Sequence, residues 1–284
     1  MAGRPIPAEY CTFDSRPFRW RMGLRRLDSD SWLELDDEWA ADIEEKRRLL
    51  DQRRNDVFAA LPGSEAACVE IAEAVFAFVR EQRLEPEPDP SEHPLVRAAL
   101  AVQEDLLVMQ RHQRAWFLTA GSLSFPTNWH LGEKMGRDLD QIHAPVPRYQ
   151  EHLGGAVPDF FDRLRVEKPM WRANWSITDD PGLRLEPELR IRSNHTMTPD
   201  EAAYQLHLRV ERQTFRRFPE TDAVLFTVRI HRQPVAWLAK EPEMAGRLAG
   251  ALAELPDDVG AYKDSTSRWA EPLITWLRQV SSDT

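Results

Sequence analysis

Two alternating stretches near the C-terminal third of the chain constrain its fold most. In the first stretch, every second residue is apolar and its neighbours are polar: Leu206, Leu208 and Val210 against His207, Arg209 and Glu211. Period-two alternation is typical of a half-buried strand. After a turn at 217–222, residues 223–231 continue as the hairpin partner, with an apolar face of Val224, Phe226, Val228 and Ile230. A sheet must therefore lie at the centre of this region.

Helical patterns surround the expected strands. A long helix is expected from Asp36 or Asp37 to about Ala60, and a second helix follows Pro62, Gly63 and the capping residue Ser64. Further strands are expected at 102–109, 115–119 and 170–177, and further helices at 128–135, 149–164, 242–255 and about 268–280. Residues 198–201 resemble the start of one more helix, with proline in its first turn. Helices inserted into and appended to antiparallel strands indicate the α+β class.

A proline-rich stretch divides the chain. Residues 85–94 read EPEPDPSEHP and contain four prolines, which favours a surface linker. The expected organisation is an N-terminal helical region at 1–84, a linker at 85–97, and a sheet-containing domain with C-terminal helices at 98–284. The alternative is a long loop inside one domain.

Charge and cysteine content exclude several classes of function. The net charge of −10 argues against nucleic acid or an anionic membrane as the main partner. Two distant cysteines, Cys11 and Cys68, are too few for an iron–sulfur cluster or a usual zinc site. Glycine-rich phosphate loops, GxSxG and HExxH are absent from the sequence. No signal peptide or long apolar run is visible, so we expect a cytoplasmic protein.

His143 is the best candidate for a metal or haem ligand. It precedes two prolines in the sequence HAPVP at 143–147. Because proline disfavours helical geometry in the preceding residue, Ala144 and Val146 are expected to be extended. The imidazole would then leave a stiff backbone, which suits a ligand. The alternative is a loop histidine after a short helix, since no partner with ligand spacing lies nearby.

The region around His143 also resembles a known family. The pattern FPxxWxLxEKxG at 125–136, followed by IHxPVPxY at 142–149, is similar to the alpha subunits of haem-dependent oxidative N-demethylases. The likeness continues in RVERQTFRR at 209–217 and in shorter pieces at 22–24, 32–36 and 103–106. These pieces keep the family's order over residues 17–276. The resemblance implies a PAS-like antiparallel sheet that holds haem b.

The activity that the resemblance implies is that of a haem-dependent monooxygenase. It would demethylate a small secondary amine such as dimethylamine with O2 and NADPH, and release formaldehyde. Electrons would come from a separate reductase subunit that carries FMN and a 2Fe-2S cluster, and another subunit would pass formaldehyde to tetrahydrofolate. The alternatives are a haem-PAS oxygen or redox sensor without turnover, and a haem-free binding relative.

With the resemblance, several residues become site candidates. His143 is the expected proximal ligand, Arg209 is expected to steady dioxygen, and Glu211 is expected to pair with a cationic amine. The expected cofactor contacts are Trp129, Lys134, Gln213, Thr214 and Arg217. Trp175 is expected to form an aromatic wall for the substrate.

Plainer interpretations stay open for most of these residues. Arg209 and Glu211 on one strand face also make a simple ion pair, and the arginines at 209–217 also suit a solvated strand edge. Trp129 and Lys134 also suit a core tryptophan and a surface lysine. Glu104 and Asp105 stand in an otherwise apolar stretch, so one of them should point inward and be paired.

Overall fold

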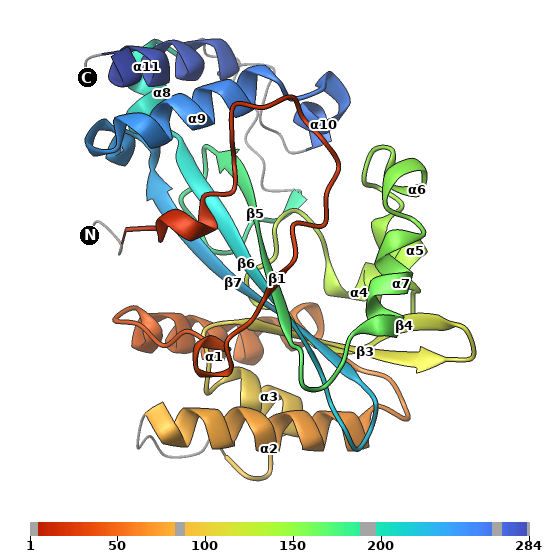
Figure 1. Ribbon diagram of the computed structural model, residues 1–284. Helices are drawn as coiled ribbons and strands as arrows, with labels where there is room; N and C mark the ends of the chain where they lie inside the picture. The colour runs from red at the N-terminus through yellow and green to blue at the C-terminus, as the bar shows by residue number, and fades with distance from the viewer. Residues whose placement is uncertain (1–4, 83–88, 188–196, 263–268, 283–284) are drawn as a thin grey trace.

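A seven-stranded antiparallel sheet runs through the part of the chain that the computed structural model describes, residues 5–82, 89–187, 197–262 and 269–282 (Figure 1). Its strands are β1 (Arg25–Arg26), β2 (Phe58–Ala60), β3 (Asp105–His112), β4 (Ala115–Ser122), β5 (Met170–Thr178), β6 (His207–Arg217) and β7 (Val224–Pro234). Their order is β1-β5-β6-β7-β3-β4-β2. With helices around this sheet, the predicted α+β class is confirmed.

The predicted hairpin is the centre of the sheet. β6 and β7 pair antiparallel over their full length, with Glu211 opposite Ile230 and Gln213 opposite Val228. β5 pairs with the other edge of β6, so that Arg172 lies opposite Gln213 and Asn174 opposite Glu211. Because successive side chains alternate between the two faces of a sheet, residues 209, 211 and 213 share one face, as predicted.

Between β4 and β5 the chain crosses from near one edge of the sheet to near the opposite edge. This crossover holds the short helices α4 (Leu131–Lys134), α5 (Leu139–His143), α6 (Tyr149–His152) and α7 (Ala156–Arg163). The predicted helix at 149–164 is thus two helices. Figure 1 shows α4–α7 gathered on one flank of the sheet, beside β3 and β4. Gly121 of β4 lets Leu131 come close, since a Cβ there would meet the Leu131 Cδ1 at 2.7 Å.

Two long helices precede β3. α1 (Trp39–Val57) ends three residues earlier than predicted, because Phe58–Ala60 joins the edge of the sheet as β2, and α2 (Glu65–Gln82) follows. Residues 83–88 of the expected linker lie outside the described residues. Within the rest of it, Pro94–Ala99 forms helix α3, capped by the His93 side chain. The division into an N-terminal region, a linker and a second domain stays a prediction.

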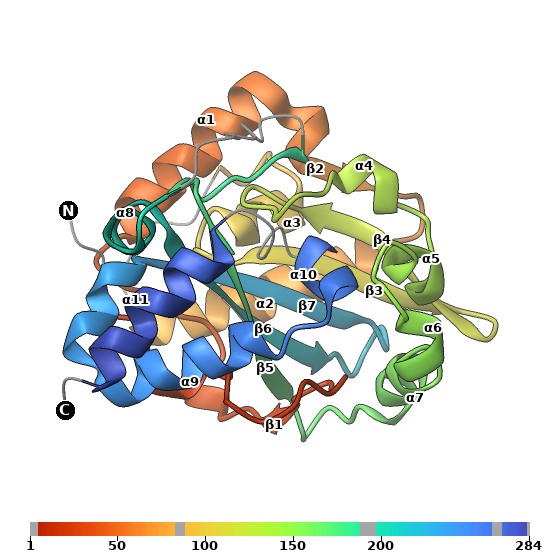
Figure 2. The same cartoon turned by 90° about the horizontal axis from the view of Figure 1, so that it is seen from above.

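The remaining helices lie at the other end of the sheet. α8 (Pro199–Gln205) begins at a capping box formed by Thr198 and Glu201, and α9 (Pro242–Ala253) and α11 (Ala270–Ser282) pack against each other. A further helix, α10 (Asp257–Tyr262), was not predicted. Figure 2 shows α9 and α11 side by side at the edge of the molecule away from α4–α7.

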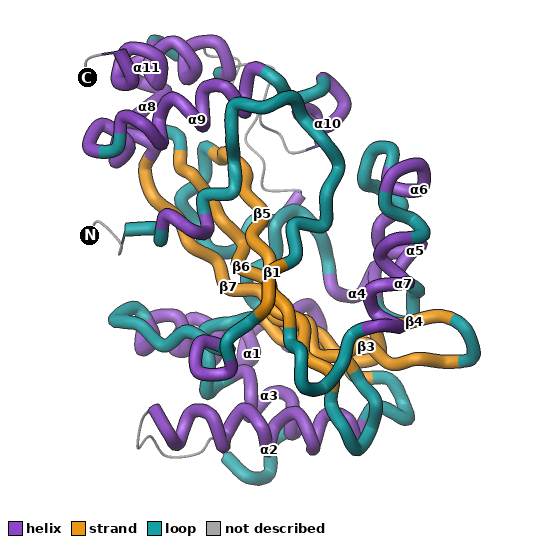
Figure 3. The backbone as a smooth tube through the Cα atoms, viewed as in Figure 1, coloured by secondary structure: helices purple, strands orange, loops and turns teal. Residues whose placement is uncertain are grey.

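The two faces of the sheet carry different cores. One face packs on α2, α8, α9 and α11 through residues such as Leu106, Leu208 and Val210. The other face packs on α4–α7 and α1, through residues such as Leu107 and Ile230. Figure 3 shows the strands as a single twisted layer with helices on its flanks. No helix in the described ranges is both long and apolar enough to span a bilayer.

Candidate functional site

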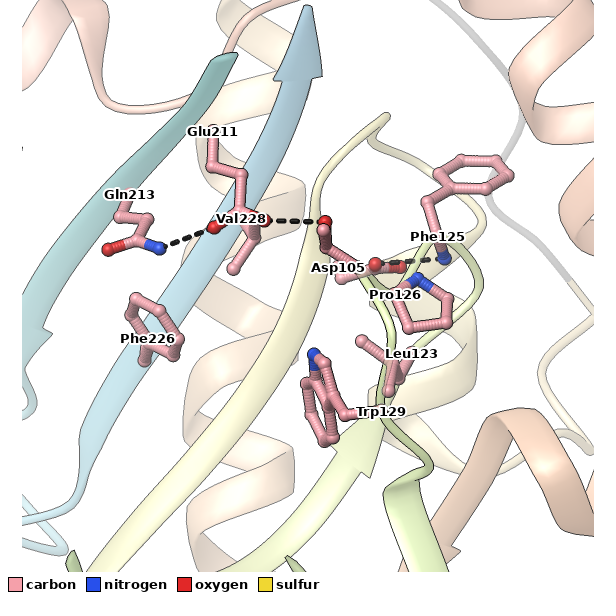
Figure 4. A pocket seen from close by; sticks show the side chains of 10 residues that line it. Asp105, Leu123, Phe125, Pro126, Trp129, Glu211, Gln213, Phe226 and Val228 are labelled. Carbon is pink, nitrogen blue, oxygen red and sulfur yellow. Dashed lines mark hydrogen bonds between the residues drawn. The ribbon is translucent and has the colours of Figure 1, made fainter. Parts of the chain in front are cut away.

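A small pocket opens on the sheet face that carries Glu211. It encloses about 70 Å³, which is room for about two water molecules or a ligand of a few heavy atoms. Its walls come from β3, β6, β7 and the segment after β4: Asp105, Leu123, Phe125, Pro126, Thr127, Trp129, Glu211, Gln213, Phe226 and Val228. In Figure 4, Glu211 and Gln213 reach in from β6, and Trp129 lies across from Phe226.

The Glu211 carboxylate is held in place by two side chains. Its Oε1 accepts a hydrogen bond of 2.5 Å from the Thr127 hydroxyl, and its Oε2 accepts one of 2.8 Å from the Gln213 amide. Each of these neighbours also lines the pocket. A carboxylate fixed in this way is a preorganised acceptor for a cation, because its orientation is set before a ligand arrives.

Asp105 supplies a second carboxylate. It is fully buried and accepts hydrogen bonds from the backbone N–H groups of Ser124 (2.7 Å) and Phe125 (2.9 Å). Burial raises the pKa of Asp105, and the ammonium group of Lys46 opposes that rise. Glu104 is also fully buried, and its Oε1 accepts from the Glu34 N–H, while its Oε2 has no hydrogen-bond partner within the described residues. Both acids therefore point inward, where the sequence led us to expect one.

Arg209 fastens the pocket wall to the sheet. Its side chain is 1% exposed, and its Nε donates to the Thr127 hydroxyl at 3.0 Å. The other guanidinium nitrogens donate to backbone carbonyls of two loops, those of Phe125, Pro126, Gly182 and Leu183. Burial lowers the pKa of Arg209 to about 10, and Glu211 opposes that shift. The guanidinium is therefore engaged with backbone oxygens on the described part of the chain.

Aromatic side chains form the apolar walls. Trp129 is partly buried in the cluster beneath α4–α7, and Phe226 stacks on Phe215 with ring centroids 5.0 Å apart. An aromatic face attracts a cation, and it also excludes water from a neighbouring carboxylate. The pocket therefore combines fixed negative charge with aromatic surface, which suits a small organic cation.

His143 lies on the same side of the sheet, at the end of α5. Its Nδ1 is 2.7 Å from the Leu139 carbonyl oxygen, so Nδ1 carries the proton and donates it. This tautomer leaves a lone pair on Nε2, the arrangement expected of a metal-ligating histidine. Burial lowers the pKa of His143 and the bond to Leu139 opposes this, while Arg172 and Lys134 lower it further. Each of the lowering effects favours the neutral, ligating form.

The backbone after His143 differs from the prediction. Ala144 was expected to be extended before Pro145, but it is helical, with φ −50° and ψ −34°. The Val146 N–H donates to the His143 carbonyl at 2.8 Å, and this turn offsets the usual steric preference. His143 is thus the last residue of a short helix, held by its own i−4 carbonyl.

Lys134 lies close to this helix. Its ammonium group donates to the Ile142 carbonyl at 2.7 Å, at the C-terminal end of α5. Burial lowers the pKa of Lys134. The contact fixes the last turn of the helix that presents His143.

Two residues near His143 were given no role from the sequence, although Tyr149 ends the IHxPVPxY pattern. Tyr149 stacks on the His143 ring, and its hydroxyl is buried without a hydrogen-bond partner in the described structure. Arg172 of β5 lies opposite Gln213, and its Nε has likewise neither solvent contact nor a partner there. The strand expected at 170–177 implies that Arg172 faces away from Trp171 and Ala173. It does not show that β5 pairs with β6, which is what places Arg172 opposite Gln213.

Three predicted site residues lie away from the pocket. Thr214 points to the opposite face, where its hydroxyl is 2.6 Å from that of Thr227. Trp175 also lies on that face, edge-on to Phe13. Arg217 pairs with Asp222 and donates to three carbonyls at the end of α7. The structure therefore brings Glu211, Gln213 and Trp129 together in the pocket, with His143 and Lys134 on the same side of the sheet.

The donor set decides which cofactor suits the site. Within the described residues, no group of three or more histidine, cysteine or acidic side chains is arranged to hold a bare metal ion. A haem needs only one axial side chain from the protein, since the macrocycle supplies four ligands. His143, with Nδ1 engaged and Nε2 available, fits that requirement.

One comparison with known proteins bears on this site. The family model described as "Haem-dependent oxidative N-demethylase, alpha subunit-like" matches residues 23–83 and 79–274. The match spans most of the chain, including the pocket residues and His143.

Proposed function

The chain belongs to the haem-dependent oxidative N-demethylase alpha-subunit-like family, and on that premise we propose that it is the catalytic subunit of an oxidative N-demethylase. The substrate would be a small secondary amine such as dimethylamine, oxidised with O2 and with electrons from NADPH. The products would be the demethylated amine and formaldehyde. The family name supports haem dependence and a multi-subunit enzyme.

The observation that carries this proposal is the fixed Glu211 carboxylate in a small aromatic pocket. A secondary amine is protonated near neutral pH and is therefore a cation. Dimethylamine and amines of similar size are also compact, with two or three carbon atoms. Glu211 offers it a charge-assisted hydrogen bond, and Trp129 and Phe226 offer apolar and cation–π contacts. The pocket volume of about 70 Å³ suits such a molecule.

His143 is the proposed axial ligand of haem b. The bound haem would supply the activation of dioxygen, which the side chains of this chain cannot perform themselves. The protein's part is to present a neutral imidazole in one tautomer, through the hydrogen bond to Leu139 and the stack on Tyr149. Lys134 supports the same helix through the Ile142 carbonyl.

Glu211 and Arg209 have different roles in this proposal. Glu211 orients the amine and accepts a proton from its nitrogen, since its carboxylate lines the pocket and is held there by Thr127 and Gln213. Arg209 acts as a positioning residue, since its hydrogen bonds hold Thr127 and the loops behind the pocket. A direct role for Arg209 toward dioxygen would require some of these bonds to be exchanged.

The remaining parts of the proposal follow from the resemblance. The antiparallel sheet with helices inserted between β4 and β5 supports a PAS-like haem domain. A separate reductase subunit with FMN and a 2Fe-2S cluster would deliver electrons, and a tetrahydrofolate-dependent subunit would take up formaldehyde. We propose a cytoplasmic location for this assembly.

Amine oxidation tests the function. Each demethylation consumes two electrons and reduced haem holds one, so the haem-loaded protein is mixed with O2, dimethylamine and an excess of a chemical electron donor, and formaldehyde and methylamine are measured. Formation of both in equal amounts, only when haem, amine and electron donor are all present, is expected. Oxygen binding without amine oxidation would contradict the proposal and favour the haem-PAS sensor, and failure to take up haem would favour a haem-free binding relative.

A further inference from the structure

Arg172 stands out among the charged residues on the pocket side of the sheet. It lies in β5, where Trp171, Ala173, Trp175 and Ile177 point to the opposite, apolar core. Its own side chain therefore lies on the face of Glu211 and Gln213, and it is directly opposite Gln213 in the register. The sequence alone drew no attention to it.

The hydrogen-bonding state of Arg172 is unusual for a shielded guanidinium. Its Nε is out of contact with solvent and has no hydrogen-bond partner within the residues that the structure describes. Arg212 and Arg229 also have a buried, unpartnered Nε, but their other guanidinium nitrogens donate to backbone carbonyls or to a carboxylate, whereas the Arg172 side chain makes no hydrogen bond within the described residues. An unsatisfied donor on a charged group costs free energy, so such groups are normally paired.

The surroundings of Arg172 link the two parts of the site. Glu211 raises the pKa of Arg172 against the effect of burial, and Arg172 in turn lowers the pKa of His143. Arg172 therefore interacts electrostatically with both Glu211 in the pocket and His143, the proposed haem ligand. The Tyr149 hydroxyl, on the ring that stacks on His143, is likewise unpartnered and buried in the described structure.

We propose that Arg172 binds a propionate carboxylate of the haem that His143 ligates. A guanidinium binds a carboxylate with two parallel hydrogen bonds, and such a pair satisfies a shielded donor and its charge together. The ligand class is a tetrapyrrole carboxylate, which is the only anion that the proposed cofactor brings to the site. The inference rests on the proposed function and assigns a residue that the sequence interpretation left out.

The placement of the other arginines sharpens this assignment. Arg217, which was expected to contact the cofactor, already pairs with Asp222 and with carbonyls near the end of α7. Arg216 lies on the opposite face, with its guanidinium 4.2 Å from the centroid of the Trp32 ring. Arg209 is engaged with loop carbonyls. Arg172 therefore has the best placement for an incoming carboxylate.

The test compares haem with its dimethyl ester, in which both carboxylates are blocked. Each is titrated into the haem-free protein, and binding is followed by the visible absorption band. Arg172→Gln is expected to weaken haem binding by about tenfold or more, the size of one lost charge-assisted pair, and to change ester binding by less than about twofold. Arg216→Gln, on the opposite face, is the matched control and should bind both ligands as the wild type does.

The possible outcomes separate the two proposals. Equal weakening of haem and ester binding, or no weakening of either, would overturn the role of Arg172 and leave the proposed function intact. A wild-type protein that binds neither ligand would overturn both. Thermal unfolding of each haem-free variant checks that it folds, and Arg172→Lys serves if the glutamine variant does not. Lysine keeps the positive charge but lacks the planar guanidinium with its two parallel donors. Arg172→Lys should therefore lower the affinity for haem less than Arg172→Gln does, and it should leave the affinity for the ester unchanged.

Discussion

The imidazole of His143 lies parallel to the phenol ring of Tyr149, with 4.7 Å between the ring centroids and 8° between the planes. Tyr149 begins α6, so the stack joins two short helices across the turn that contains Pro145 and Pro147. The imidazole is thus fixed on its face by Tyr149 and on its edge by Leu139. A ring held at two places has one orientation, which is what a ligand to a planar cofactor requires.

Removing the proposed ligand tests this geometry most directly. His143→Ala is expected to abolish haem uptake, or to replace the wild-type visible spectrum with that of weakly bound haem, since the axial bond fixes the iron. The measurement is the absorption spectrum after reconstitution with haem. His152→Ala, at an exposed histidine of α6, should give the wild-type spectrum. Identical spectra for His143→Ala and wild type would rule out His143 as the ligand.

The stack itself has a measurable contribution. Tyr149→Leu removes the aromatic face, so haem affinity should fall by about three- to tenfold, the usual range for an aromatic pair. Tyr149→Phe keeps the face and removes a hydroxyl that is unpartnered and buried in the described structure. The haem-free phenylalanine variant should therefore unfold at the same temperature as the wild type or at a higher one. A leucine variant with wild-type haem affinity would show that the stack does not position the ring.

Charge at Glu211 should decide whether an amine binds. Glu211→Gln keeps the shape and removes the negative charge, so the affinity for dimethylamine should fall by about tenfold or more. Isothermal titration of the haem-loaded protein measures this. Glu220→Gln, at an exposed acid on the turn after β6, is the control for a change in net charge. Equal amine affinity in wild type and Glu211→Gln would place the amine site elsewhere.

Replacing Arg209 should lower the free energy of unfolding, because its main role is to hold two loops together. Arg209→Met leaves carbonyls of two loops, at Phe125 and Leu183, without the donors that join them, and we expect a loss of about 3–5 kcal/mol in the free energy of unfolding. Urea denaturation measures it. Arg163→Met removes a highly exposed ion pair with Asp159 and should cost less than about 0.5 kcal/mol. A stable Arg209→Met variant that has lost activity would favour a direct catalytic role instead.

The half-buried Glu34, on the sheet face away from the pocket, determines part of the response of stability to low pH. Burial tends to raise the pKa of Glu34, but His231, Arg212 and Tyr10 lower it to about 2, below the ordinary value of 4.5. Because the folded-state pKa is lower, this stabilisation is complete above about pH 4.5 and disappears as the pH falls toward 2. The contribution is about 3 kcal/mol.

Glu34→Gln separates this group from the other acids. The variant should be less stable than the wild type at pH 7, and the difference should shrink between pH 4.5 and 2. Urea midpoints at several pH values measure the difference. A difference that stays constant over this range would mean that Glu34 does not titrate as described.

Local sequence patterns located the central strands correctly but did not give the helix ends or the order of strands in the sheet. Alternation located β6 and β7 and placed Arg209, Glu211 and Gln213 on one face, because the period of a strand is a property of the backbone. The same rule put Thr214 on the other face, although it was grouped with the cofactor contacts. Helix ends shifted where tertiary pairing intervened, as at Phe58, which joins β2 and ends α1.

The pocket depends on which strands become neighbours, and no local pattern encodes that. Asp105, Phe226 and Glu211 come from three strands whose order in the sheet differs from their order in the chain. Arg172 gained its interest only from its register opposite Gln213 and its unpartnered Nε. Trp175 looked like a pocket wall in the sequence, but its strand face belongs to the other core.

The bonds of Arg209 also bear on how the chain folds. The residue lies 84 positions after Phe125 and 26 positions after Leu183, and one guanidinium joins the loops that contain them. Contacts between such distant positions form late, because the intervening chain must lose its freedom first. The pocket should therefore be among the last parts of the molecule to assemble, and a growing chain on the ribosome would lack it until both β6 and β7 had emerged.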